Sequence, residues 1–188
     1  MDSYKQKFII AAVILAILSA SAIWFWNSGK SFSLANNPDD LIALTGATLG
    51  ENYQIYKNDH YGFSIEHPKN LKIEEFDEGD GAATFVFVDE TSREGFQIFA
   101  SQVETEIDGA PSAEDIKADI PEMIIEDATE VVIGDSQHAL IFWSEDPTIG
   151  RTREVWFINN GNLYAITAYE EFDQELAQIM DTLKFVKD

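Results

Sequence analysis

The residue types able to perform chemistry in this 188-residue chain are three histidines and a large set of acids, with no cysteine. His60 and His67 fall at opposite ends of one expected strand, so a zinc ion shared by them would need loops that fold back. His138 begins another expected strand. Solvated histidines are the simpler interpretation of all three. We therefore predict no metal site and no cofactor.

The acidic run DEGDG, Asp77 to Gly81, invites comparison with a calcium-binding loop. An EF-hand needs acids at alternate positions and a glutamate six residues after its glycine, and here Gly79 and Gly81 occupy two of those positions. Asp80-Gly81 instead suits the two central residues of a tight hairpin turn with positive φ. A hairpin turn is the prediction, and a weak cation contact is the alternative.

Catalytic motifs are missing from the sequence. It contains no GxSxG, P-loop, GxGxxG or HExxH pattern, and Gly62-Phe63-Ser64 lacks the second glycine of a nucleophile elbow. We predict that the protein is not an enzyme. The alternative is an envelope hydrolase that uses carboxylates such as Glu145 and Asp146 in the loop WSEDPTIG.

Two groups of residues are candidates for contact with a ligand or partner. Arg151 and Arg153 project from one side of an expected strand, where they can hold an anionic ligand or form structural salt bridges with the many acids. Glu104, Glu106 and Asp108 are acids expected at the rim of the domain, where they would steer a basic partner.

The charge balance narrows the class of partner. The chain has 34 acidic and 12 basic residues, a formal net charge of −22, and only Arg93 and Lys117 are basic between Ile73 and Gly150. Such a surface repels phosphate backbones and anionic head groups, which excludes nucleic acid as an expected partner. We expect an unidentified protein of the envelope as partner, and the alternative is that the acids only maintain solubility.

The N-terminal stretch KQKFIIAAVILAILSASAIWFWNSGK predicts a membrane anchor. No charged residue occurs from Phe8 to Trp26, a length that crosses roughly 30 Å of hydrocarbon as a helix. Lys5 and Lys7 before this run place the N-terminus in the cytoplasm. Ala20-Ser21-Ala22 also fits a signal-peptide cleavage site, so removal of the segment is the alternative.

The expected organisation has four parts. Residues 1–7 form a short cytoplasmic N-terminus, 8–26 a transmembrane helix, 27–51 a flexible tether rich in small polar residues, and 52–188 one domain outside the cytoplasm. Without cysteines this domain has no disulfide, so packing must stabilise it. Its expected localisation is the cell membrane, anchored by a single pass.

Strand patterns dominate the domain. Runs such as TFVFV, ALIFW, EVWFI and LYAIT are apolar on both faces, and Asn160-Gly161 is a strong hairpin signal between the last two. Two helical stretches remain to cover such a sheet: 112–125, which opens with the capping box Ser112-Ala-Glu-Asp115, and 172–183. We therefore predict an α+β fold in which one antiparallel sheet carries helices on both faces, an α/β/α sandwich.

Three stretches resemble PsbP-like domains: NDHYGFSIEHPKNL, EVWFINNGNLYAITAY and ELAQIMDTLKF. The resemblance covers Asn52 to Phe185, with one departure, Leu71 where many relatives carry a tryptophan. PsbP-like domains include extrinsic subunits of photosystem II and many anchored bacterial proteins of unknown role. The resemblance implies a membrane-anchored binding or accessory module outside the cytoplasm, without a catalytic site.

Overall fold

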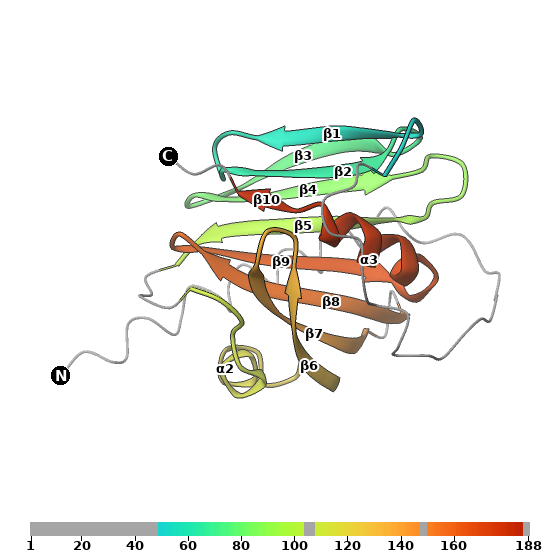
Figure 1. Ribbon diagram of the computed structural model, residues 1–188. Coiled ribbons are helices and arrows are strands. Elements are labelled where there is room, and N and C mark those ends of the chain that lie inside the picture. The colour runs from blue at the N-terminus through green and yellow to red at the C-terminus, as the bar shows by residue number, and fades with distance from the viewer. Residues whose placement is uncertain (1–48, 104–107, 147–149, 186–188) are drawn as a thin grey trace.

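The computed structural model describes residues 49–103, 108–146 and 150–185. These residues form two antiparallel β-sheets and two short α-helices, shown in Figure 1. In chain order the elements are β1 (Tyr53–Asn58), β2 (Phe63–Pro68), β3 (Lys72–Gly79), β4 (Ala82–Val88), β5 (Gly95–Gln102), α2 (Ala113–Asp119), β6 (Glu126–Ile133), β7 (Gln137–Asp146), β8 (Gly150–Asn159), β9 (Asn162–Tyr169), the 3₁₀ helix η2 (Glu170–Phe172), α3 (Asp173–Asp181) and β10 (Lys184–Phe185).

The larger sheet has seven strands in the order β3-β4-β5-β9-β8-β7-β6. Two of its hairpins have the turns predicted from the sequence. Asp80 and Gly81 have φ of 51° and 77°, and Asn160 and Gly161 have φ of 48° and 71°, each pair being the two residues between paired strands. Asn, Asp and Gly tolerate positive φ at both central positions of such a turn. Both turn predictions are confirmed.

The smaller sheet has three strands in the order β1-β2-β10 and covers one face of the larger sheet. Phe63 and Ile65 of β2 alternate into the core, where they join Phe85 of β4 and Tyr164 of β9. Leu176, one of several apolar residues of α3, enters the same core. This core therefore lies between two sheets, with α3 beside the smaller one (Figure 1).

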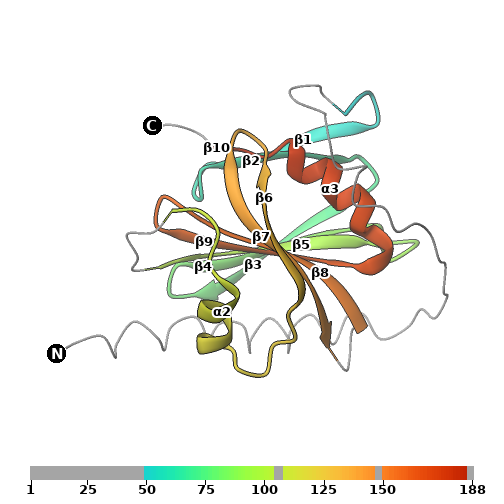
Figure 2. The same ribbon diagram turned by 60° about the horizontal axis from the view of Figure 1, so that its bottom comes forward.

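The opposite face of the larger sheet has its own core under α2. Ile116 and Ile120 pack with Phe99, Leu140 and Trp156 from the central strands. Ser112 caps α2, since its Oγ accepts a hydrogen bond from the Asp115 N–H over 3.1 Å, and the predicted capping box is present. Figure 2 shows α2 on the side of the larger sheet opposite α3 and the smaller sheet.

The predicted α/β/α sandwich is wrong. Strands dominate the structure, and a second sheet covers much of the face that was assigned to a helix alone. The helices are only seven and nine residues long. Helix α2 ends at Asp119, so the predicted helical stretch 112–125 is not helical beyond that residue. Apolar residues on both faces of a strand require that both faces be covered, but they do not specify whether a helix or a sheet covers them.

The expected membrane helix lies outside the described residues. Within the described ranges no helix combines the length and the apolarity needed to cross a bilayer. The predicted segments 1–7 and 8–26, and most of the predicted tether 27–51, lie outside those ranges.

Candidate functional site

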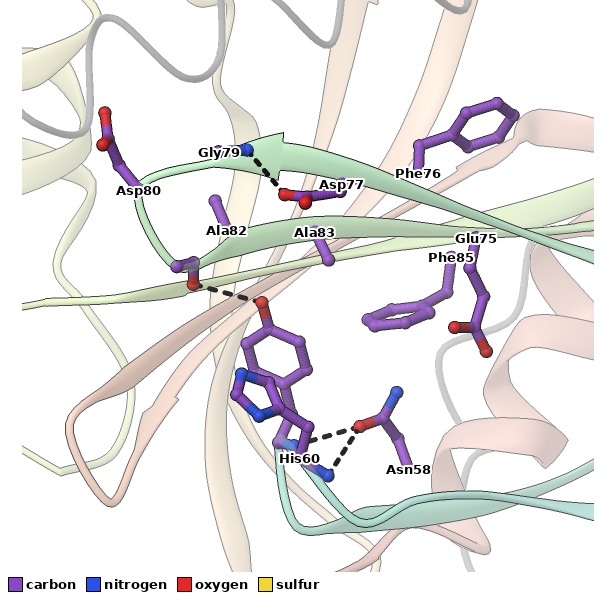
Figure 3. Close-up of a pocket in the computed structure, with 12 residues that line it drawn as sticks. Asn58, His60, Glu75, Phe76, Asp77, Gly79, Asp80, Ala82, Ala83 and Phe85 are labelled. Atoms are coloured by element: carbon purple, nitrogen blue, oxygen red, sulfur yellow. Dashed lines mark hydrogen bonds between the residues drawn. The ribbon is translucent and has the colours of Figure 1, made fainter.

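A depression of about 630 Å³ opens between the β1–β2 turn and the β3–β4 hairpin. Asn58, His60 and Tyr61 line it from the turn, and the facing side is formed by residues 75–77, 79–83 and Phe85. In Figure 3 the turn with Asn58 and His60 lies opposite the hairpin. We call this depression the acidic pocket, because Glu75, Asp77 and Asp80 all line it.

Hydrogen bonds fix the turn wall of the acidic pocket. Asn58 Oδ1 accepts from the backbone N–H groups of His60, over 3.1 Å, and Tyr61, over 3.0 Å. The Tyr61 hydroxyl donates to the Gly81 carbonyl over 3.1 Å and so ties the turn to the hairpin. On the core side of the turn, the buried Tyr164 hydroxyl donates to the Tyr61 carbonyl over 2.6 Å. The two walls are therefore connected to each other and to the core.

The hairpin wall places two carboxylates on one side of β3. Glu75 and Asp77 are two residues apart, and alternate residues of a strand face the same side, about 7 Å apart. Asp77 Oδ1 accepts from the Gly79 N–H over 2.9 Å, beside an irregularity in the strand register between these residues. Asp80 lies at the hairpin tip (Figure 3).

A chain of hydrogen bonds orients Glu75. The Asn58 side-chain amide donates to the Tyr56 hydroxyl over 3.0 Å, and this hydroxyl donates to Glu75 Oε1 over 2.7 Å. Burial raises the pKa of Tyr56, and the Glu75 carboxylate adds to the rise. Burial likewise raises the pKa of Tyr61, with a further contribution from the charge of Asp77. Both phenols therefore stay protonated beside the two carboxylates.

The acidic pocket carries uncompensated negative charge. Across the described part of the chain, none of Glu75, Asp77 and Asp80 has a salt-bridge partner. Nor do three metal-ligating side chains come close enough anywhere in these ranges to hold an ion.

The structure places the two candidate arginines in salt bridges. Arg151 pairs with Glu170 over 3.0 Å, and Arg153 pairs with Asp173 at the start of α3 over 2.7 Å, with a second hydrogen bond at 3.3 Å. Both guanidinium groups also lie over the Trp143 ring, at 4.4 and 3.6 Å from its centre. These contacts are the structural salt bridges expected as the alternative role of Arg151 and Arg153, and their binding of an anionic ligand stays a prediction.

The other candidate acids are only partly described. Glu104 and Glu106 lie outside the described residues, while Asp108 is exposed beside Gly109, which pairs with Ile158. Glu145 is exposed on β7, and the Asp146 side chain is not described. Of the described acids, neither Asp108 nor Glu145 lines the acidic pocket. The predicted roles of all five acids stay predictions.

The three histidines have separate surroundings. His60 lines the acidic pocket, with its ring edge-on to Tyr61 at 4.7 Å. His67 is buried, its Nδ1 lies 2.9 Å from the Pro68 carbonyl, and burial lowers its pKa. His138 is exposed and pairs with Glu130 over 2.7 Å. The interpretation of all three as solvated residues is wrong for His67, which is buried near the end of β2.

Sequence reasoning missed a buried acid, Glu154 on β8. Its side chain is 4 % exposed and accepts hydrogen bonds from Thr152 Oγ1 (2.9 Å), Thr167 Oγ1 (2.9 Å) and Trp156 Nε1 (3.1 Å). Burial raises its pKa to about 7, against the effect of these three donors. The available signal was the spacing of Thr152, Glu154 and Trp156, which period-two alternation puts on one face.

Comparison with known proteins identifies the fold. No protein family model and no curated protein sequence matches the chain. Among solved structures, the solution structure of cyanobacterial PsbP (CyanoP) from Synechocystis sp. PCC 6803 is similar, with a TM-score of 0.51 and 14 % identity. The match covers 78 % of this chain and 99 % of the CyanoP chain. The chain thus has a PsbP-like fold, and the resemblance seen in the sequence is confirmed at the level of the fold.

Proposed function

We propose that this protein is a membrane-anchored accessory module that binds a protein partner outside the cytoplasm. The observation that carries this proposal is the PsbP-like fold, matched over nearly the whole length of CyanoP. PsbP-like domains, which the sequence resembles, include extrinsic subunits of photosystem II, so the resemblance favours an accessory role. The uncharged stretch from Phe8 to Trp26 supports attachment of this domain to a membrane.

The charge of the described surface supports a protein partner of opposite charge. The acidic pocket has no internal counter-ion in the described ranges, and the whole chain has a formal net charge of −22. A negative field of this kind accelerates encounter with basic surfaces and suppresses contact with anionic ones. Binding, rather than turnover of a substrate, is the role that these features favour.

The anchor is tested by the state of the N-terminus in membranes. We expect the protein purified from membranes to begin near Met1 and to resist extraction with alkaline carbonate, since 19 consecutive uncharged residues stay in the bilayer. N-terminal sequencing and the carbonate wash provide the measurement. A mature terminus at Ile23 would show that the segment is a cleaved signal peptide.

The orientation of the protein in the membrane can be measured by labelling single introduced cysteines, because the chain has no cysteine of its own. Single cysteines replace Thr91, in the exposed β4–β5 loop, and Ser3, before the apolar run. A membrane-impermeant maleimide is expected to label Thr91→Cys in intact spheroplasts, and Ser3→Cys only after the membrane is opened. The reverse labelling pattern would place the domain in the cytoplasm and contradict the proposed function.

A further inference from the structure

The smaller sheet differs in charge from the rest of the molecule. Its strands β1, β2 and β10 contain two lysines, Lys57 and Lys184, and a single acid, Glu66. Core-facing residues alternate with Ser64 and Glu66 along β2, which places these two on the outer face of the sheet. Lys57 and Lys184 pair with Ser64 from its two sides, so the three residues form one row on that face.

An exposed aliphatic side chain lies next to this row. Ile55 pairs with Glu66 and is 70 % exposed, more than any other large apolar side chain of the described residues. We call the surface formed by Ile55, Lys57, Ser64, Glu66 and Lys184 the lysine face. Neighbouring strands are about 5 Å apart, so the two lysines are about 10 Å apart. Ammonium groups beside an aliphatic side chain suit the boundary between lipid phosphates and acyl chains.

The acids nearest to the lysines do not cancel their charge. Glu66 Oε2 accepts the Leu49 N–H over 2.8 Å, which holds this carboxylate against the chain that enters the domain. Lys57 pairs with Asp59 over 2.5 Å, but their side chains are 54 % and 81 % exposed, and an ion pair so open to water is weak and easily exchanged. No described carboxylate forms a salt bridge with Lys184.

The chain also enters the domain at the lysine face. The Leu49–Glu66 hydrogen bond places the first described residue there. Residues 27–48 separate the expected membrane helix from Leu49. A flexible chain of about 22 residues has a root-mean-square end-to-end distance of about 25 Å. An anchor of this length keeps the lysine face near the bilayer.

The remaining charge favours the same orientation. The chain has a formal net charge of −22, which an anionic bilayer repels. On the larger sheet, Arg151 and Arg153 are paired with Glu170 and Asp173, and Lys72 lies beside two carboxylates. The domain therefore approaches an anionic surface at the lowest cost with its lysine face forward.

We propose that the lysine face docks on the anionic head-group layer of the membrane that holds the anchor. The proposal rests on the proposed function, because it specifies how the anchored module is oriented. Lys57 and Lys184 contact lipid phosphates, and Ile55 enters between the head groups. The α2 side of the larger sheet, opposite the smaller sheet, then points away from the bilayer and toward a partner (Figure 2).

The test uses the isotope-labelled full chain inserted in lipid nanodiscs that carry a gadolinium-chelating lipid. The nanodiscs consist of phosphatidylcholine, with or without phosphatidylglycerol. In the anionic nanodiscs, nuclear magnetic resonance is expected to show strong broadening of the Ile55, Lys57 and Lys184 amide signals and little broadening of the Lys117 signal on α2. Without phosphatidylglycerol, the broadening of the three signals on the lysine face is expected to fall.

Variants separate the lysine face from total charge. Lys57→Gln with Lys184→Gln is expected to lower the ratio of docked to free domain about 25-fold, since each lysine near an anionic surface contributes about fivefold. The matched control, Lys72→Gln with Lys117→Gln, removes the same charge from β3 and α2 and should dock as the unmodified chain does.

Three results would overturn the docking. They are broadening that is equal on the lysine face and on α2, broadening that phosphatidylglycerol does not change, and equal loss in the two double variants. Each is read on a chain already inserted in the nanodisc, so the anchor of the proposed function stands when the docking fails. A chain that does not enter the nanodisc overturns the anchor and the docking together.

Discussion

Replacing Trp156 with alanine is expected to lower the free energy of unfolding by about 3–5 kcal/mol. The indole is 3 % exposed and packs with Phe142, with ring centres 6.1 Å apart, and with Leu140 and Ala165 under α2. Truncation leaves a cavity that neighbouring strands cannot close, because both are fixed by their ladders. Urea denaturation followed by circular dichroism measures the effect.

Two further variants identify the cause of the loss at Trp156. Trp156→Phe keeps most of the ring but removes the N–H that donates to Glu154, and it is expected to cost about 1–3 kcal/mol. Trp143→Ala removes a half-buried indole on the opposite face and should cost less than Trp156→Ala. A loss below about 1 kcal/mol for Trp156→Ala would contradict its place in the core.

Glu154→Gln is expected to become more stable relative to the unmodified protein as the pH rises. The folded-state pKa of Glu154, about 7, exceeds its ordinary value of 4.5, so between these values the folded state binds the proton more tightly than the unfolded state. Stability therefore falls as pH rises through this window, by about 3 kcal/mol in total. Glutamine carries no such charge; its Oε1 can accept from Trp156 Nε1 and Thr167 Oγ1, and its Nε2 can donate to Thr152 Oγ1.

The measured quantity is the difference in unfolding free energy between Glu154→Gln and the unmodified protein, from pH 4.5 to pH 8. The difference between the two proteins is measured because His67 changes the stability of each with the opposite sign. The pKa of His67 is lowered in the folded state, so stability falls as the pH drops below 6.5. His67 is present in both proteins and cancels. Glu126→Gln, an exposed acid, serves as the control and should show a flat difference. A flat difference for Glu154→Gln would place its carboxylate in water.

Local features of the fold were predictable because their causes are local. Asp80-Gly81 and Asn160-Gly161 form the expected turns since few other residues accept positive φ at both positions. The capping box at Ser112 likewise depends on residues three apart. The second sheet was not predictable in this way, because Phe63 and Ile65 show alternation but not the surface on which their strand packs.

The candidate site depends on contacts that no sequence spacing reveals. Glu75 belongs to the acidic pocket only because the turn at Asn58 lies opposite its hairpin. Arg153 was recognisable as a candidate, but its partner Asp173 lies twenty residues away on another element. Glu154 is polar in a strand whose apolar neighbours dominate the pattern, so its burial follows only from the sheet order and the cover on that face.

Photocrosslinking in native membranes tests the proposed binding role most directly. The full chain carries p-benzoylphenylalanine in place of either His60, exposed on the turn wall of the acidic pocket, or Val132, 58 % exposed on β6 at the opposite edge of the sheet. The expected result is one discrete adduct with another protein from the His60 position and none from Val132. Absence of an adduct from both positions would contradict the proposal that this domain is a binding module.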